Sequence, residues 1–177
     1  DVKVFQPSES NHGLTNNEIN ELCGDKNGRM YIRSGNDLIK LDIYTEQFTC
    51  LRQKGVYGLF CKKDTLWVSC ADGIYYYTGQ GTELTFFARV QKGFVGRALY
   101  VDRETVWVVT RKYLVAISRE DPLRQEILLT LDKGNCILGD SSGNIWVGAW
   151  NGLYRVSPDR ETTAYVSHSG MGELSDN

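Results

Sequence analysis

The chain has 177 residues and a formal net charge of −2, so it is long enough to bury one sizeable core. The net charge is small and the sequence has no basic stripe, so it lacks the positive charge that is typical of nucleic-acid-binding proteins. No apolar run reaches the roughly 18 residues of a membrane helix. With 18 Gly, 3 Pro and no helical periodicity, the composition favours an all-β fold.

The first predicted element is a short strand at residues 2–5, Val-Lys-Val-Phe. After it, one motif occurs four times, each copy centred on an aromatic anchor at spacings of 36, 40 and 39 residues: Tyr31, Trp67, Trp107 and Trp146. An aliphatic residue follows each anchor seven positions later: Leu38, Ile74, Leu114 and Leu153. Two apolar columns with a period near 40 residues indicate a repeat fold.

Each copy reads as four short antiparallel strands. In the fourth copy, a strand at 136–138 precedes the turn Asp140-Ser-Ser-Gly143, which has the Asp and Gly typical of tight turns. Alternating residues at 145–149 and a strand at 153–156 follow. A more polar strand closes each copy, at residues 48–51, 84–87, 127–130 and 163–166. Four strands per period of about 40 residues predict a β-propeller blade.

We therefore expect an all-β chain of about four blades, with each anchor packed between neighbouring blades. The expected blades are residues 14–51, 52–87, 91–131 and 134–167. Residues 2–5 match 163–166, and Leu-Thr-Asn-Asn at 14–17 matches Leu-Ser-Asp-Asn at 174–177. Residues 1–13 are therefore interpreted as the outer strand of a preceding blade with its connection. Residues 168–177 are interpreted as the entry to a following blade. We therefore expect the chain to be a segment of a larger, seven-bladed propeller, and the alternative is a closed four-bladed ring.

These residues resemble the two-component regulator propeller repeat. Residues 13–19, Gly-Leu-Thr-Asn-Asn-Glu-Ile, carry the first half of the pattern. The second half is carried by Asp140, Gly143, Trp146, Gly148, Gly152, Leu153 and Arg155. The middle copies depart from the pattern, because Thr65 and Thr105 replace the turn glycine and Tyr113 replaces the glycine before Leu114. The likeness covers essentially the whole chain.

The resemblance implies a non-catalytic sensor segment of a membrane-anchored histidine kinase, on the periplasmic or extracellular side of the inner membrane. Hybrid two-component systems of this kind detect glycan fragments, so it implies an oligosaccharide ligand. The alternatives are a propeller enzyme of the streptogramin-lyase type and a protein-interaction scaffold. Neighbouring blades or another copy of the chain are the expected protein partners. No nucleic acid and no membrane contact by this segment are expected.

Few residues of the sequence suggest catalysis or metal binding. His12 and His168 lie about four blades apart, which disfavours a catalytic pair. The five cysteines lack a Cys-x-x-Cys pair, so we expect no metal site, no cofactor and mainly buried free thiols. No disulfide is expected, and Cys50 with Cys61 is the pair to watch. Residues 25–28 have the wrong spacing for a calcium loop and predict a turn.

A ligand is expected at the loops, because rigid scaffolds carry binding residues there. The loops between the second and third strands differ from copy to copy, whereas the strands do not. They supply the candidate binding residues Asn36, Asp72, Arg111, Lys112, Trp150 and Asn151. Aromatic, amide and charged groups of this kind suit a polar ligand such as an oligosaccharide.

Overall fold

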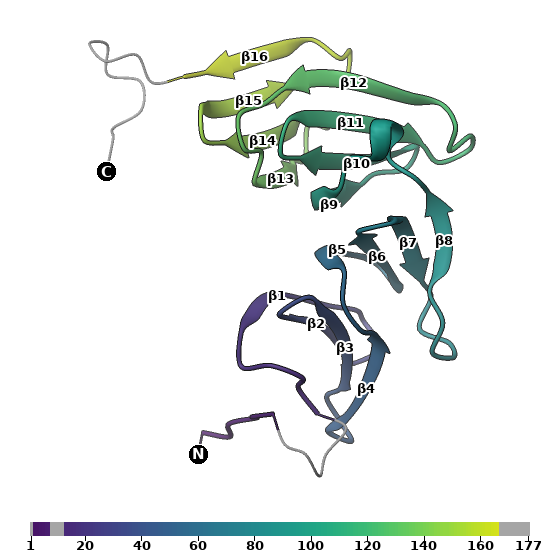
Figure 1. Ribbon diagram of the computed structural model, residues 1–177. Coiled ribbons are helices and arrows are strands. Elements are labelled where there is room, and N and C mark those ends of the chain that lie inside the picture. The colour runs from purple at the N-terminus through teal and green to yellow at the C-terminus, as the bar shows by residue number, and fades with distance from the viewer. Residues whose placement is uncertain (1, 8–12, 167–177) are drawn as a thin grey trace. The chain divides into compact units, whose positions relative to one another are not determined.

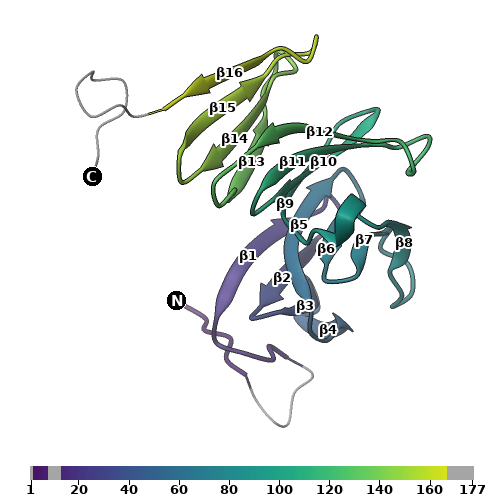
Figure 2. The ribbon, with the colours of Figure 1, turned by 45° about the horizontal axis from the view of Figure 1, so that its top comes forward.

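The computed structural model describes residues 2–7 and 13–166. The chain divides into two compact units between Arg89 and Val90, and each unit contains two four-stranded antiparallel sheets. In every sheet the strands lie side by side in chain order, as Figures 1 and 2 show. A meander of four strands in this order is a propeller blade, so the predicted all-β class and the four-stranded repeat are confirmed.

The first unit holds the first and second sheets. The first sheet consists of β1 (Ile19–Gly24), β2 (Arg29–Ser34), β3 (Asp37–Asp42) and β4 (Gln47–Arg52). The second consists of β5 (Val56–Lys62), β6 (Thr65–Cys70), β7 (Gly73–Tyr77) and β8 (Thr85–Ala88).

The second unit begins with a single 3-10 turn, η1 (Gln91–Gly93). The third sheet consists of β9 (Gly96–Val101), β10 (Thr105–Thr110), β11 (Tyr113–Ser118) and β12 (Gln125–Thr130). The fourth consists of β13 (Cys136–Gly139), β14 (Ile145–Ala149), β15 (Gly152–Val156) and β16 (Thr162–Tyr165). Within residues 2–7 and 13–166, no helix has both the length and the apolar character needed to cross a membrane.

The turn between the first two strands forms as its sequence predicts. In the fourth sheet, Asp140 Oδ1 accepts hydrogen bonds from the backbone N–H of Ser142 and of Asn144, each at 2.9 Å. Gly143 has a φ of +82°, a conformation that L side chains rarely adopt. Asp25 and Gly28, with a φ of +74°, form the same turn in the first sheet.

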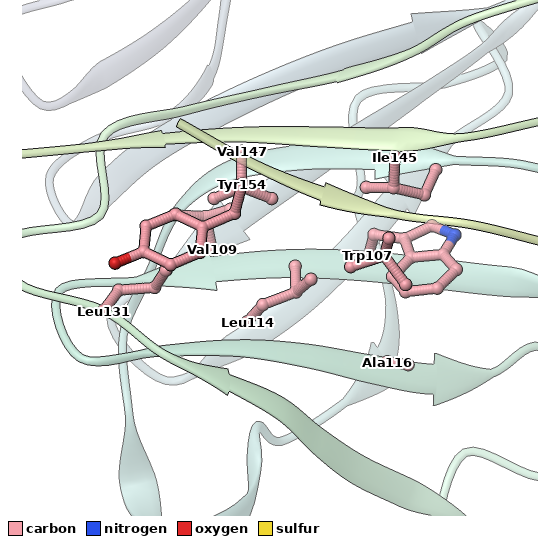
Figure 3. Close-up of a cluster of buried hydrophobic side chains, with 9 residues drawn as sticks. Trp107, Val109, Leu114, Ala116, Leu131, Ile145, Val147 and Tyr154 are labelled. Carbon is pink, nitrogen blue, oxygen red and sulfur yellow. The ribbon is translucent and has the colours of Figure 1, made fainter. Parts of the chain in front are cut away.

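The largest apolar cluster of each unit lies between its two sheets. In the second unit, Figure 3 shows Val109 and Leu114 of the third sheet facing Val147 and Tyr154 of the fourth. In the first unit, the cluster combines residues of both sheets: Tyr31, Leu38, Val56, Leu59, Leu66, Val68, Cys70 and Tyr77. Because a blade has two apolar faces, stacking against a neighbour is what buries them.

The four anchors all lie in the second strand of their sheets, but their burial differs. Tyr31, Trp67 and Trp107 are buried, whereas Trp146 is half-buried. The ring of Trp146 instead stacks on Tyr165 of β16, with centroids 6.0 Å apart. Tyr31 and Trp107 belong to the clusters between two sheets, as expected of the anchors. For Trp146 this packing stays a prediction, because the described residues include no sheet beyond the fourth.

The predicted strand at residues 2–5 is not a strand, since no strand is assigned within residues 2–7. This segment contacts the end of the first sheet through side chains. The ring of Phe5 meets that of Phe48 edge-on at 5.5 Å, and Lys3 forms an ion pair with Glu46. Side-chain contacts of this kind do not require the main-chain pairing of a strand.

The prediction of mainly buried thiols also fails. Cys70 is buried, Cys23 and Cys61 are half-buried, and Cys50 and Cys136 are exposed. Cys50 lies in the outer strand β4 and Cys136 is the first residue of β13, where apolar neighbours in sequence do not ensure burial. Three other expectations fall outside the described residues: those on His12, on His168 and on residues 174–177.

Candidate ligand-binding site

The candidate residues lie in two kinds of segment, which we name by position. A 2–3 loop joins the second and third strands of a sheet, and a connector joins the fourth strand of one sheet to the first strand of the next. In the second unit, the 2–3 loops are residues 111–112 and 150–151, and the connector is residues 131–135.

A buried threonine shapes the 2–3 loop of the third sheet. The hydroxyl of Thr110 accepts hydrogen bonds from the backbone N–H of Lys112 and of Tyr113, at 3.2 and 2.9 Å. The same hydroxyl donates to the carbonyl of Tyr113 at 3.1 Å. The side chain therefore closes the turn from inside, and Arg111 and Lys112 are left exposed.

The connector is hydrogen-bonded to this loop. The N–H of Leu131 donates to the carbonyl of Lys112 at 2.7 Å, and that of Gly134 donates to the carbonyl of Arg111 at 3.1 Å. A Cβ on Gly134 would lie only 2.4 Å from the carbonyl oxygen of Thr110, so this close approach requires glycine. A hollow of about 590 Å³ results, lined by residues 111–113 and 130–133.

The 2–3 loop of the fourth sheet is attached to the same connector. The N–H of Trp150 donates to the carbonyl of Asp132 at 2.9 Å, and Asn151 Oδ1 accepts from the N–H of Asp132 at 3.1 Å. The Trp150 side chain is 75% exposed, and Lys133 Nζ lies 3.8 Å from its ring centroid. This is a close cation–π contact at the surface.

Four of the six predicted residues therefore converge on one connector. Together with Lys133 they form what we call the cationic loop site: Arg111, Lys112, Lys133, Trp150 and Asn151. Sequence reasoning missed the roles of Thr110 and Asp132. The Asp-Lys-Gly sequence of the connector could have been read as a turn signal. In the structure, Lys133 adopts the left-handed conformation of such a turn, with a φ of +49°.

The left-handed lysine is a repeated feature. Lys54, Lys92 and Lys133 have φ values of +61°, +57° and +49°, and a glycine follows each of them. Each stands between the fourth strand of one sheet and the first strand of the next. Positive φ is uncommon for lysine, and persists only where surrounding contacts impose it. The N–H of Lys54, for example, donates to Asp37 Oδ1 at 2.6 Å.

Asn36 and Asp72 lie in the first unit and have structural contacts. The carbonyl of Asn36 accepts from the N–H of Val56 at 3.0 Å. The carboxylate of Asp72 accepts from Arg52 at 2.7 Å and from the Tyr75 hydroxyl at 2.8 Å. Burial opposes ionisation of Asp72, but these two hydrogen bonds, a backbone hydrogen bond and the positive charge of Arg52 together outweigh it and lower its pKa. Asp72 thus links the outer strand of the first sheet to the second sheet.

A second hollow of about 480 Å³ lies at the opposite ends of these strands, and its charges are largely matched. Its lining includes four arginines and three glutamates: Arg103, Arg119, Arg124, Arg160, Glu104, Glu120 and Glu126. Arg160 pairs with Glu126, and Arg119 donates to two backbone carbonyls. Among the described residues, no group of three or more His, Cys, Asp or Glu is placed to hold a metal ion.

No family model and no curated protein matches the chain. Among solved structures, it is similar to the extracellular domain of a protein assigned to the one-component systems of B. thetaiotaomicron. The two are 16% identical with a TM-score of 0.74, over 97% of this chain and 25% of that one. A second such domain, assigned to the hybrid two-component systems of the same organism, is 19% identical with a TM-score of 0.76, over 91% and 25%.

A streptogramin B lyase structure is 17% identical with a TM-score of 0.67, over 84% of this chain and 54% of that one. The chain spans about a quarter of the length of the two extracellular domains. At such identities these similarities establish the fold alone, which is that of β-propeller blades.

Proposed function

We propose that the chain is a non-catalytic segment of an extracytoplasmic sensor in two-component signalling, and that it binds a glycan-derived ligand at the cationic loop site. The contact between Lys133 and the exposed ring of Trp150 carries this proposal. An exposed indole gives a flat apolar face on which a sugar ring stacks. The ammonium, guanidinium and amide groups around it provide hydrogen bonds to hydroxyl groups.

The charges of the site favour a ligand that carries acidic groups. The hollow is lined by three cationic residues, Arg111, Lys112 and Lys133, and by one acidic residue, Asp132. Arginine binds planar carboxylate or sulfate groups through two parallel hydrogen bonds. The ligand class that fits this site is therefore an oligosaccharide with uronic acid or sulfate groups.

The expected mechanism is ligand-biased packing between propellers or protomers in a membrane-anchored protein. A ligand shifts such an equilibrium only by its differential affinity for the two states. Both extracellular domains similar to this chain belong to proteins assigned to signalling systems, which supports the sensor assignment.

The proposal is tested by titrating the chain with oligosaccharides matched in length but differing in charge, using calorimetry. We expect binding of acidic members that weakens as salt rises, and weaker binding of neutral ones. Trp150→Ala and Lys133→Ala should each lower the affinity about 10-fold, as losing one stacking or ionic contact of about 1–2 kcal/mol would.

Tyr44→Ala and Lys26→Ala are the matched controls, since both residues are exposed and neither lies in the cationic loop site. The proposal fails if no acidic oligosaccharide binds, or if the control variants lose as much affinity as the site variants. Turnover of a bound compound would instead favour the lyase alternative.

A further inference from the structure

The innermost strands of the first unit, β1 and β5, contact each other in a regular register. Glu21 Oε2 in β1 accepts a hydrogen bond from the backbone N–H of Leu59 in β5, at 3.0 Å. Two residues further along each strand, the thiols of Cys23 and Cys61 share a hydrogen bond. Leu59 follows Glu21 by 38 positions, and Cys61 follows Cys23 by the same number. The two contacts therefore belong to one alignment of the strands.

The equivalent positions in the second unit also lie in direct contact. Cys23 is opposite the anchor Tyr31 in its sheet, as Tyr100 is opposite Trp107. Cys61 is opposite Leu66, as Gly139 is opposite Ile145.

A Cβ on Gly139 would lie 2.1 Å from the ring of Tyr100. The second unit therefore has a large residue, Tyr100, against a glycine, Gly139, at this contact. The first unit has two cysteines at the equivalent positions, Cys23 and Cys61.

We propose that Cys23 and Cys61 are an oxidisable pair, which a disulfide oxidant converts into a covalent link between the first and second sheets. Both side chains are half-buried and pack on the same apolar cluster. They come from different sheets, so the bond would join two elements that only side-chain packing and hydrogen bonds otherwise hold together. The other thiols of the unit differ, because Cys50 is exposed and Cys70 is buried.

The reaction is a two-step thiol–disulfide exchange. The thiolate of Cys61 attacks one sulfur of the oxidant RSSR, which gives a mixed disulfide and RS⁻. Cys23 then loses its proton to RS⁻ and attacks the Cys61 sulfur, which releases the second RS⁻, protonated by solvent. The pair is oxidised by two electrons and the oxidant is reduced to two RSH.

The order of attack follows from the environment of Cys23. Its hydrogen bond to Cys61, its burial and the nearby carboxylates of Glu21 and Asp25 raise the pKa of the Cys23 thiol. A thiol with a raised pKa is a poor first nucleophile, so Cys23 acts as the resolving residue. Formation of the disulfide should therefore be faster at alkaline pH.

The test uses the 177-residue chain with the two exposed cysteines replaced, Cys50→Ser and Cys136→Ser, which leaves Cys23, Cys61 and Cys70. The folded protein is incubated with hydroxyethyl disulfide, quenched in acid and alkylated after denaturation without reductant. We expect the loss of two of its three thiols, a cross-linked peptide pair containing Cys23 and Cys61, and full reversal by dithiothreitol. The midpoint of thermal unfolding should rise on oxidation.

Adding Cys23→Ser gives the matched control, in which Cys61 should retain the mixed disulfide and the thermal midpoint should not rise. Three results would overturn the proposal. They are three thiols that stay free in the folded protein, a disulfide that includes Cys70, and a mixed disulfide on Cys61 that persists although Cys23 is present.

Discussion

The indole nitrogen of Trp146 donates a hydrogen bond to Asp140 Oδ2 at 2.9 Å, so the turn aspartate of the repeat binds the aromatic anchor of the same hairpin. Trp107 and Asp102 have the same relationship at 2.6 Å. The hydroxyl of Tyr31 donates to Asp25 Oδ2 at 3.3 Å. The aspartate thus links the conformation of the turn to the position of the ring.

The first prediction concerns acid stability. Hydrogen bonds from Trp146 and Asn144 lower the pKa of Asp140 to about 2. Because the folded-state pKa lies below the unfolded value of about 3.9, its contribution is present above about pH 4 and is lost as pH falls towards 2. Asp140→Asn should reduce stability at pH 7, and its difference from the unsubstituted chain should shrink by pH 2. Urea unfolding at four pH values measures this, and a difference independent of pH contradicts it.

The second prediction concerns the buried anchor of the third sheet. Trp107 is 6% exposed, and its indole N–H loses its carboxylate acceptor in Asp102→Ala. A buried donor without a partner costs about 1–3 kcal/mol, and the lost turn hydrogen bonds add to this. Asp102→Asn retains an acceptor oxygen and should cost less. Equal losses of unfolding free energy in the two variants would show that the indole contact is unimportant.

The third prediction uses two glycines at one position of the repeat. Gly139→Ala places a Cβ against Tyr100, whereas the Cβ in Gly24→Ala has no atom closer than 3.6 Å. Overpacking costs about 1–3 kcal/mol, so Gly139→Ala should be clearly the more destabilising of the two. Combining it with Tyr100→Leu should recover part of the loss. Thermal unfolding of these three variants and of the unsubstituted chain measures the effects, and equal losses in the two single alanine variants would contradict the alignment of the sheets.

The fourth prediction separates structural from binding residues among the sequence-based candidates. Asp72 accepts from Arg52 at 2.7 Å in a partly exposed pair. Such pairs contribute at most about 1 kcal/mol, so Asp72→Asn should destabilise the chain slightly, and less at high salt. The affinity for an acidic oligosaccharide should not change. A marked loss of affinity in a calorimetric titration would return Asp72 to the binding site.

The fold was predictable because each copy of the repeat has the same local sequence features. The anchors and the residues seven positions later form columns, and the turn from Asp140 to Gly143 has the residues that the turn requires. The segment at residues 2–5 was not predictable in the same way. Its alternation suits a strand, but pairing depends on a neighbouring main chain, which sequence pattern does not reveal.

The candidate site was predictable in part. Loop variation pointed to Arg111, Lys112, Trp150 and Asn151, but not to the contact of Trp150 with Lys133, because that pairing depends on how the connector folds back. The thiol pair was also missed. Cys50 and Cys61 are closer in sequence, yet Cys23 meets Cys61 because inner strands of adjacent sheets align one period apart.

The most direct test of the proposed function is an NMR titration of ¹⁵N-labelled protein with an acidic oligosaccharide. Of the indole signals of the four tryptophans, that of Trp150 should shift, while those of Trp67, Trp107 and Trp146 should stay in place. Backbone shifts should map to residues 111–113 and 131–133, which line the hollow of the cationic loop site. Shifts confined to the hollow around Arg103 and Arg124, or an unchanged Trp150 signal at saturation, would contradict the proposal.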